Sequence, residues 1–552
     1  MRVIAVVQAD LEVTPLGTRS RLADDLMGVP VLRRTLLRLA RASRVSTVYV
    51  LCPGEQHARC VSLLRGVDAV VRAHDAPPPP WRPLVQTARK WSLDAWRGGV
   101  GGTTHFDEFT DARPVDALLA EAKADAVLMV PPSAPLLDPD LVDALIDHLE
   151  AHRDDSKLSF MPAPPGLTGI ALSAAMIREL AEKNIPLGWI FSYKPDDPQR
   201  DLVFQSCRCE APAVLSEVSV LLMADTRRSF DRIDALLQSH PDPCAETIGR
   251  WFADRDLDDA EPMPREVEIE LMTSDPYPES RLRPRGGLVE LRGPIDPALV
   301  ERIAAEVSSY DDALVVLGGF GDPLCHPRFS DVLAATRRAQ DGNRRLFGLA
   351  VRTCGVNLSD NHIRAVIDHD VDLLCVLLDA WTPALYARLQ SPARPDEARL
   401  ADVLQRIESL TAAVAKRHAV KPLVVPEMVK TTENVHELDA FHDGWLRRVG
   451  AVNIVGPSHY GHLIEDRGVL PMAPFPRTAC RRIRSRCVVL ADGRVTLCDQ
   501  DVNGRHAVGD LNQQSLEEIW MSTAYENVRD AHRRDCFDVT PLCGGCEEWH
   551  RP

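Results

Sequence analysis

The chain has 552 residues, of which 45% are hydrophobic, and its formal net charge is −16 at pH 7. At about 150 residues per domain, this length predicts three or four domains with ordinary buried cores. The acidic balance disfavours an extended polyanion such as duplex DNA as a partner, so we expect no binding of nucleic acid.

No apolar run in the sequence approaches the roughly 18 residues of a membrane span. The opening apolar run, residues 3–7, is too short for a signal peptide. We therefore expect a cytoplasmic protein without a membrane partner. Because the cytosol keeps thiols reduced, a cluster among the 14 cysteines predicts a metal or catalytic site in preference to disulfides.

The first 250 residues alternate strand and helix patterns. Strands are predicted at residues 3–7, 47–52 and 126–130, and helices at 31–42 and 139–152. Strand, helix and strand at this spacing are typical of a parallel α/β sheet. An acidic, proline-bearing stretch within residues 251–265 predicts a linker.

Residues 266–475 contain a second series of strand and helix patterns. The predicted strands lie at residues 267–271, 313–317, 347–352, 373–378, 423–429 and 452–455. Helical patterns separate most of them, including residues 297–307 and 398–414. Repeated β–α units of this length predict a full or partial parallel barrel.

The last stretch, residues 476–552, is rich in cysteine and glycine and has little apolar periodicity. Such a segment lacks the apolar area for a core of its own, so we expect a bound metal to stabilise it. In Cys543-Gly-Gly-Cys546 a tight turn lets two thiolates reach one centre. Residues 487–498 predict a hairpin turning at Asp492-Gly493, which folds Cys498 back.

Four soft thiolates suit either Zn²⁺ or an iron–sulfur centre. The segment resembles the SPASM/Twitch auxiliary-cluster domain of radical S-adenosylmethionine (SAM) enzymes in Ala491-Asp-Gly-Arg-Val-Thr-Leu-Cys498 and in Ser515-Leu-Glu-Glu-Ile-Trp520. The single-cluster version of that domain uses four cysteines. The resemblance therefore implies one [4Fe–4S] cluster on Cys480, Cys498, Cys543 and Cys546.

Two further cysteines of this segment, Cys487 and Cys536, are interpreted as ordinary thiols, although either could replace a member of the set. A structural zinc site remains the alternative to the cluster. Its usual pattern has two Cys-x-x-Cys pairs, and this segment has one.

The middle domain resembles the radical SAM barrel at a glycine-rich strand end, Val316-Leu-Gly-Gly-Phe-Gly-Asp-Pro323. Glycines let the backbone approach a ligand, and a carboxylate can hold an ammonium group. The resemblance thus implies a SAM-like ligand at Gly318, Gly319, Gly321, Asp322 and Pro323. A plain strand-to-loop turn explains the same residues equally well, so SAM binding stays open.

A radical SAM enzyme carries Cys-x-x-x-Cys-x-x-Cys after its first barrel strand. Residues 273–282 of this chain contain no cysteine, and no such triplet occurs elsewhere in the sequence. Serine and aspartate do not replace three thiolates around a low-potential cluster. We therefore interpret the barrel as degenerate and do not expect it to cleave SAM reductively.

The N-terminal domain resembles sugar-activating nucleotidyltransferases, which have a Rossmann-like sheet, in Gly17-Thr-Arg-Ser-Arg-Leu22 and Gly28-Val-Pro-Val-Leu32. The resemblance implies that Arg19 and Arg21 contact a nucleotide phosphate. The Mg²⁺-binding aspartate of that family is replaced by Ser133-Ala134, so we do not expect Mg²⁺ or nucleotidyl transfer. Asp138 is predicted to cap the helix that follows.

The three parts together resemble the spiro-SPASM family. The predicted fold is α/β, with a Rossmann-like sheet at residues 1–250, a partial (β/α) barrel at 266–475 and a SPASM/Twitch domain at 476–552. The main hypothesis is a non-radical iron–sulfur protein that serves a redox partner or binds a small molecule or peptide. The alternatives are a nucleotidyltransferase that activates a sugar or related phosphate, and a zinc protein built for interaction.

Overall fold

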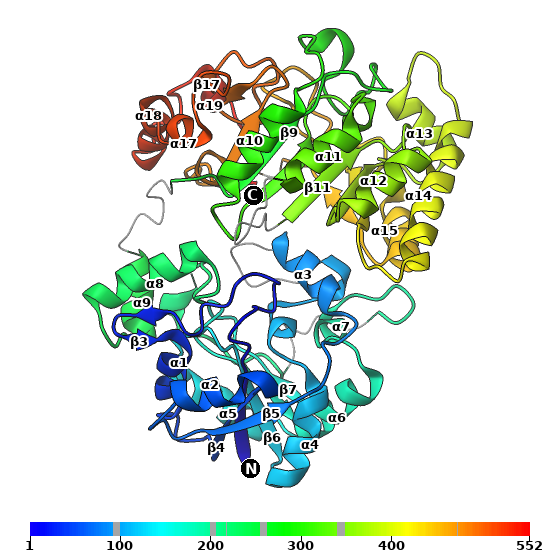
Figure 1. The fold of residues 1–552 in the computed structure, drawn as a ribbon. Coiled ribbons are helices and arrows are strands. Elements are labelled where there is room, and N and C mark those ends of the chain that lie inside the picture. The colour runs from blue at the N-terminus through cyan, green and yellow to red at the C-terminus, as the bar shows by residue number, and fades with distance from the viewer. Residues whose placement is uncertain are drawn as a thin grey trace. The chain divides into compact units, whose positions relative to one another are not determined.

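The computed structural model describes residues 1–91, 100–198, 206–216, 218–253, 262–338, 348–471 and 473–551. The chain divides into two compact units, Met1–Leu257 and Asp258–Pro552 (Figure 1). Most of the predicted linker at residues 251–265 lies outside the described residues. None of the helices in these ranges has the length and apolar character that crossing a membrane would require.

The first unit is built on a six-stranded sheet in the order β5-β4-β1-β6-β8-β7. Its central strand, β1 (Val3–Gln8), pairs in parallel with β4 (Thr47–Pro53) and β6 (Ala126–Val130). The remaining strands are β5 (Val70–His74), β7 (Leu158–Ser159) and β8 (Ile170–Ser173), of which β8 runs antiparallel to β6. The predicted strands and their parallel arrangement are confirmed.

Helices cover both faces of this sheet. Val3, Ala5 and Val7 of β1 pack into one core with α1 (Val31–Leu39) and α5 (Pro139–Ala151), whereas Ile4 and Val6 pack into another with α4 (Ala112–Ala122) and α6 (Ala174–Lys183). This alternation is the pattern of a strand buried on both sides. The other helices are α2 (His57–Leu63), α3 (Arg82–Lys90), α7 (Gly188–Phe191), α8 (Arg227–Ser239) and α9 (Ala245–Ala253).

The second unit contains a nine-stranded sheet in the order β14-β13-β12-β11-β10-β9-β15-β16-β17. Its parallel strands are β9 (Glu266–Glu270), β10 (Leu314–Gly318), β11 (Gly348–Thr353), β12 (Leu373–Leu377), β13 (Leu423–Val429) and β14 (Asn453–Val455). Parallel strands that follow one another in chain order confirm the partial barrel.

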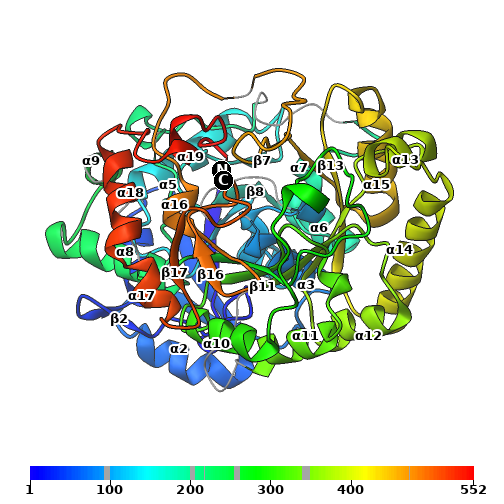
Figure 2. The ribbon, with the colours of Figure 1, turned by 90° about the horizontal axis from the view of Figure 1, so that it is seen from above.

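Helices of the second unit follow the strands along the outer side of the sheet, as α10, α11, α12 and α14 do in Figure 2. The set comprises α10 (Pro297–Val307), α11 (Phe329–Arg338), α12 (Asp360–Asp368), α13 (Pro383–Gln390), α14 (Ala398–Lys416) and α15 (Leu438–Val449). Helix α10 begins as its sequence predicts, because Asp296 caps it and Pro297 occupies its first turn.

The C-terminal segment shares the sheet of the barrel. Strand β15 (Arg486–Val489) pairs in parallel with β9 and antiparallel with β16 (Arg494–Thr496), which confirms the predicted hairpin, and β17 (Ala507–Asp510) completes the edge. The helices are α16 (Arg482–Ser485), α17 (Leu516–Trp520), α18 (Thr523–Arg533) and α19 (Pro541–Gly544). Apolar residues of this segment, such as Trp520 and Tyr525, belong to the core of the barrel. Packing against the barrel therefore supplies the core that the segment lacks by itself.

The face of the barrel sheet that points away from the helices carries charged side chains. On β9, Val267 and Ile269 belong to the core, and the alternate residues Glu268 and Glu270 point to the opposite face. Arg352 on β11 and Glu427 on β13 form an ion pair with a distance of 2.9 Å. Buried charges on an inner face need partners, and these partners come from neighbouring strands.

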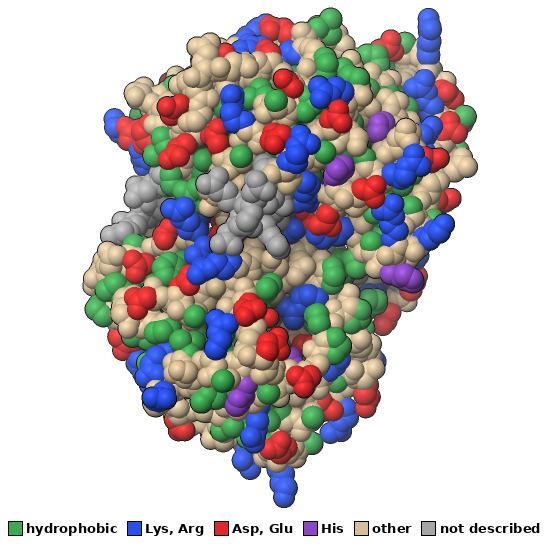
Figure 3. Space-filling model, in the orientation of Figure 1, with side chains coloured by type: hydrophobic (Ala, Val, Ile, Leu, Met, Phe, Trp, Pro, Cys, Tyr) green, Lys and Arg blue, Asp and Glu red, His purple; other side chains and the backbone are tan. Residues whose placement is uncertain are grey.

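On the surface drawn in Figure 3, basic and acidic side chains are interspersed on each unit.

Candidate metal centre

The four cysteines predicted as ligands lie at the ends of short elements of the C-terminal segment. Cys480 precedes α16, Cys498 follows β16, and Cys543 and Cys546 flank the end of α19. The hydroxyl of Thr540 caps α19 by accepting the backbone N–H of Cys543 at 3.0 Å. Cys543 is buried, and the other three are partly exposed.

Burial raises the pKa of all four thiols, and neighbouring thiols raise it further. Cys480 and Cys543 both act on Cys498, while Cys480 also acts on Cys546. Their mutual effect places the four predicted ligands in one neighbourhood. Within the ranges that the structure describes, no three His, Cys, Asp or Glu side chains converge tightly enough to hold a single metal ion.

Backbone N–H groups are already directed at the sulfur atoms. The N–H of Glu548 donates to Sγ of Cys546 at 3.3 Å. Backbone hydrogen bonds from Ile483 and Gln500 act against burial and lower the pKa of Cys480 and Cys498. Thiolates that hold an iron–sulfur cluster are stabilised in this way by amide donors and by burial. The four cysteines therefore fit such a cluster by their chemistry.

The two remaining cysteines of the segment lie in other surroundings. Cys487 belongs to the hydrophobic core, and burial raises its pKa to about 12. Cys536 is exposed, and its thiol lies 3.5 Å from the carbonyl oxygen of Arg534. The assignment of all six cysteines as ligands or ordinary thiols stays a prediction.

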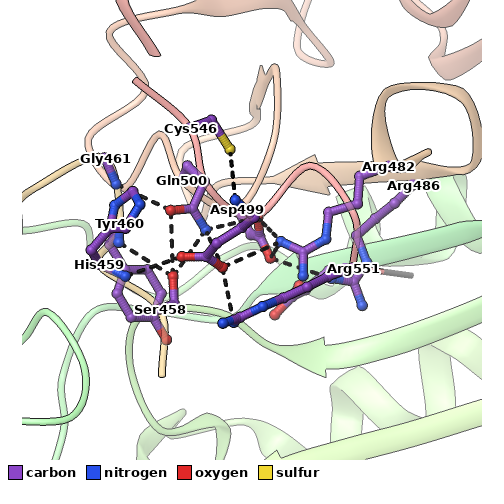
Figure 4. Close-up of polar contacts among 12 residues, drawn as sticks. Ser458, His459, Tyr460, Gly461, Arg482, Arg486, Asp499, Gln500, Cys546 and Arg551 are labelled. Carbon is purple, nitrogen blue, oxygen red and sulfur yellow. Dashed lines mark hydrogen bonds and ion pairs between the residues drawn. The ribbon is translucent and has the colours of Figure 1, made fainter. Parts of the chain in front are cut away.

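A charged network surrounds Asp499, the residue after Cys498 (Figure 4). Nη1 of Arg482 lies 2.8 Å from both carboxylate oxygens of Asp499, and Arg486 lies 3.4 Å from one of them. Although burial acts to raise the pKa of Asp499, the guanidinium groups of Arg482 and Arg486 hold it below its usual value. The carboxylate next to a predicted ligand is thus kept ionised.

The same network ties the segment after β14 to the cysteine turn (Figure 4). The carboxylate of Glu548 accepts the backbone N–H of His459 at 3.1 Å and a guanidinium N–H of Arg551 at 3.0 Å. The side chain of Gln500 accepts the backbone N–H of Gly461 at 3.1 Å. These contacts fix residues 458–461 beside Cys546.

A small polar pocket of about 60 Å³ lies at the carboxyl ends of the barrel strands and reaches this network. Tyr460 and Asp499 form part of its wall, together with Glu268, Arg352 and the loop after β9. Ligands of parallel barrels bind at this end of the strands. Asp499 therefore connects the cysteine site to the pocket.

Ion pairs fill the loop after β9, where a radical SAM enzyme would carry its three cysteines. Arg285 pairs with Asp275 at 2.9 Å, and Arg283 pairs with Asp379 at 2.7 Å. All four side chains are less than a tenth exposed. Neither pair was predicted from the sequence: Arg283 and Asp379 are distant along the chain, and Asp275 and Arg285 lie in one loop whose irregular backbone alone brings them together.

Of the residues predicted to contact a SAM-like ligand, Gly319, Gly321 and Asp322 line the pocket, whereas Gly318 and Pro323 are outside its described lining. A Cβ atom on Gly321 would lie 2.1 Å from the carbonyl oxygen of Met272. This glycine is therefore required by the neighbouring loop, which is a different reason from the predicted approach of a ligand.

The carboxylate of Asp322 is engaged within the protein. It accepts hydrogen bonds from the hydroxyl of Thr353 at 2.8 Å and from the backbone N–H groups of Cys354 and Leu324 at 2.8 and 2.9 Å. Burial raises its pKa. Asp322 thus joins the end of β10 to the end of β11, and contact with a ligand stays a prediction.

The first unit has a larger pocket, of about 330 Å³, at the carboxyl ends of β1, β4, β5 and β6. Arg21 and Ser133 line it. Arg19 is not part of its described lining, and forms a two-bond ion pair with Asp24 at 2.7 Å. Chain order reverses between β1 and β6, and such a switch point is where open α/β sheets bind ligands. Asp138 caps α5, as predicted.

Four acidic residues of this pocket, Asp10, Glu108, Asp111 and Asp225, were not predicted from the sequence. Glu108 lies 2.6 Å and Asp225 3.8 Å from the buried guanidinium group of Arg89. Burial raises the pKa of Glu108 to about 7, in spite of Arg89. The pocket therefore combines acidic side chains with the basic groups of Arg21 and Arg82.

Comparison with known proteins assigns the C-terminal part. Residues 480–547 match the SPASM family, described as an iron-sulfur cluster-binding domain. The chain is thus a mixed α/β protein that ends in a SPASM iron–sulfur cluster-binding domain.

Two relatives align with about half of the chain. An uncharacterized protein of Treponema pallidum is 27% identical over 265 residues, which cover 46% of this chain and 68% of that protein. The tungsten-containing aldehyde ferredoxin oxidoreductase cofactor-modifying protein of Pyrococcus furiosus is 26% identical over 308 residues, which cover 46% of this chain and 79% of that protein.

Three solved structures align with the chain at low identity and with TM-scores below 0.5. BtrN in complex with AdoMet and 2-DOIA is 15% identical, with a TM-score of 0.36 over 51% of this chain and 93% of BtrN. Streptococcus suis SuiB bound to precursor peptide SuiA is 11% identical, with a TM-score of 0.39 over 65% and 80% of the two chains. A cytidylyltransferase from Leptospira borgpetersenii is 13% identical, with a TM-score of 0.32 over 46% and 95%.

Proposed function

We propose that this chain is a non-radical iron–sulfur protein that holds one [4Fe–4S] cluster on Cys480, Cys498, Cys543 and Cys546. The observation that carries the proposal is that these four cysteines lie in the segment that matches the SPASM domain, where a backbone N–H already donates to Sγ of Cys546. When bound, such a cluster would supply one-electron transfer. The role that we infer is to pass electrons to a partner protein, or to bind a small molecule or peptide beside the cluster.

The loop after β9 supports the non-radical part of the proposal. It offers Asp275, Arg283 and Arg285 in place of thiolates, and these side chains are already paired and buried. Guanidinium groups do not bind iron, and their removal from these pairs would leave buried charges without partners. We therefore expect the reduced protein to form no 5′-deoxyadenosine from SAM, as chromatography of the products would show.

The cluster is tested by anaerobic purification and measurement of iron, sulfide and zinc per chain, with an EPR spectrum after reduction by dithionite. We expect about four irons and a reducible signal. Cys498→Ala should lose the iron, while the matched variant Cys487→Ala, in the same hairpin, should keep it. One zinc without sulfide would establish the structural zinc site instead, and iron retained in all four ligand variants would refute the assignment.

A second candidate function belongs to the first unit. Its pocket has the size of a small-molecule site and carries Arg21 beside Ser20 and Gln8. These groups suit a nucleotide or another phosphorylated ligand, as a nucleotidyltransferase would bind. Calorimetry with CTP, GTP, UTP and ATP in the presence of Mg²⁺ tests this candidate. Arg21→Ala should weaken any binding more than Arg19→Ala, and no heat at millimolar nucleotide would exclude it.

A further inference from the structure

Two buried histidines beside the cysteine site each present an N–H group that has no acceptor among the described residues. Nδ1 of His532 accepts the backbone N–H of Cys480 at 3.2 Å, and Nδ1 of His459 accepts the backbone N–H of His462 at 3.2 Å. An imidazole whose Nδ1 accepts a hydrogen bond carries its proton on Nε2. Within the residues described, neither Nε2 has a hydrogen-bond partner.

These two N–H groups are shielded from solvent, since His532 is 1% exposed and His459 is 8% exposed. A buried donor without an acceptor costs roughly 1–3 kcal/mol. Native structures contain few such groups, and each one calls for a partner that is a water, an ion or a cofactor. Two of them beside the same site indicate an acceptor that none of the described residues provides.

His532 is connected to the site on the side of Cys480 and Cys543. Besides its bond to Cys480, its ring packs edge-on against Phe537, with ring centres 5.3 Å apart. The guanidinium group of Arg477 lies 4.5 Å from the centre of the Phe537 ring and donates to the carbonyl oxygen of Cys543 at 2.8 Å. The imidazole is thus held by residues that also position two of the predicted ligands.

His459 is connected to the turn between Cys543 and Cys546. Its ring stacks on that of His462, with centres 4.4 Å apart and planes 4° from parallel. His462 in turn lies against Gly545, where an added Cβ atom would be 2.8 Å from Nε2 of His462. The backbone N–H of His459 also donates to Glu548, whose own N–H reaches Sγ of Cys546.

We propose that His459 and His532 donate their Nε2–H groups to sulfur atoms of the cluster and thereby raise its reduction potential; this inference rests on the proposed function. Reduction adds negative charge to the sulfur atoms of a cluster, so donors directed at them favour the reduced state. Both histidines would be positioning residues that tune the cluster from outside its ligand set.

The test uses the full-length protein with ¹⁵N-labelled histidine, purified anaerobically and reduced by dithionite. Pulsed EPR measures the magnetic coupling between the cluster and nearby nitrogen nuclei. We expect weak coupling to the labelled imidazoles, as hydrogen bonding to sulfur gives. Strong coupling would mean that a histidine is itself a ligand, and the absence of coupling would mean that the donors point elsewhere; either result overturns the proposal.

Variants assign the effect to each residue. His532→Leu and His459→Leu, which remove the N–H donor, should each remove part of the histidine coupling and shift the reduction potential to more negative values in an EPR-monitored titration. The matched control is His436→Leu, whose side chain is 64% exposed, and it should change neither. Variants that keep about four irons but have unchanged potentials would refute the inference alone, whereas natural protein that binds no iron would refute the proposed function. Should a variant lose its iron, the labelled natural protein still decides.

Discussion

Two cysteines of one hairpin have different surroundings and should respond differently to substitution. Cys487 is fully buried in the core, on β15, whereas Cys498 lies past the end of β16 in the neighbourhood of the other predicted ligands. We expect Cys487→Ala to lower the free energy of unfolding by about 1 kcal/mol, because it removes a buried sulfur, and to leave the iron content unchanged. Urea unfolding and iron analysis measure both effects. Loss of iron in this variant would make Cys487 a ligand.

A second residue, Asp107, should make the stability of the first unit depend on pH. Its carboxylate accepts the backbone N–H groups of Thr104 and Gly188, and burial raises its pKa from 3.8 to about 6. In the window between these values the folded state binds more protons than the unfolded state, so stability falls as the pH rises. The loss amounts to roughly 3 kcal/mol, at 1.36 kcal/mol per pKa unit.

Comparison with Asp107→Asn isolates this effect, because the other titrating groups are common to both proteins. We expect the natural protein to lose stability relative to the variant between pH 4 and pH 6.5, as urea unfolding at each pH would measure. A difference in stability that is constant over this range, or that grows with pH, would contradict the prediction.

Single residues could be predicted from the sequence where the signal is local. The cap at Asp138 follows from an aspartate before a proline and an amphipathic run, and the structure confirms it. The pair of Arg283 and Asp379 could not be predicted, since nearly a hundred residues separate them. Arg19 and Arg21 share one motif, yet the backbone of their loop directs only Arg21 to the pocket.

Among the elements, the strands that were predicted have bounds close to those observed, because alternating or continuous apolar runs mark them directly. The short or partly exposed strands β5, β7, β8 and β17 were not predicted. The chemistry of the inner barrel face was already visible in the alternation of Val267, Glu268, Ile269 and Glu270. The sequence did not show which groups pair with these carboxylates. Their basic partners lie on other elements, such as Arg486 on β15, which contacts Glu266 at the start of β9.

The end of β10 yields a prediction for an element. Gly321→Ala would place a methyl group 2.1 Å from the carbonyl oxygen of Met272 and so separate the loops after β9 and β10. We expect a loss of about 2–3 kcal/mol in the free energy of unfolding, as overpacking against backbone produces. Gly287→Ala is the matched control, since no atom lies within 4 Å of its added methyl group, and it should change stability by less than about 0.5 kcal/mol. Equal effects in the two variants would show that the contact with Met272 is relaxed without cost.

For the whole molecule, the sequence predicted three domains, and the structure divides the chain into two compact units. The SPASM match begins at residue 480, but strand β15 extends the barrel sheet through its pairing with β9. This pairing could not be predicted from composition. A shortage of apolar residues shows that the segment cannot form its own core, but it does not show which other core the segment joins.

Removal of the cluster should therefore affect the whole second unit and spare the first. A ligand that binds only the folded state stabilises whatever unfolds together with its site. Since residues 486–489 are hydrogen-bonded into the barrel sheet, we expect two calorimetric transitions in the loaded protein, and chelation of the iron should lower the temperature of only one. Cys498→Ala should reproduce the shift, and Cys536→Ala, at an exposed position, should not. A third transition that responds to chelation by itself would show that the C-terminal segment unfolds independently of the barrel, despite the shared sheet.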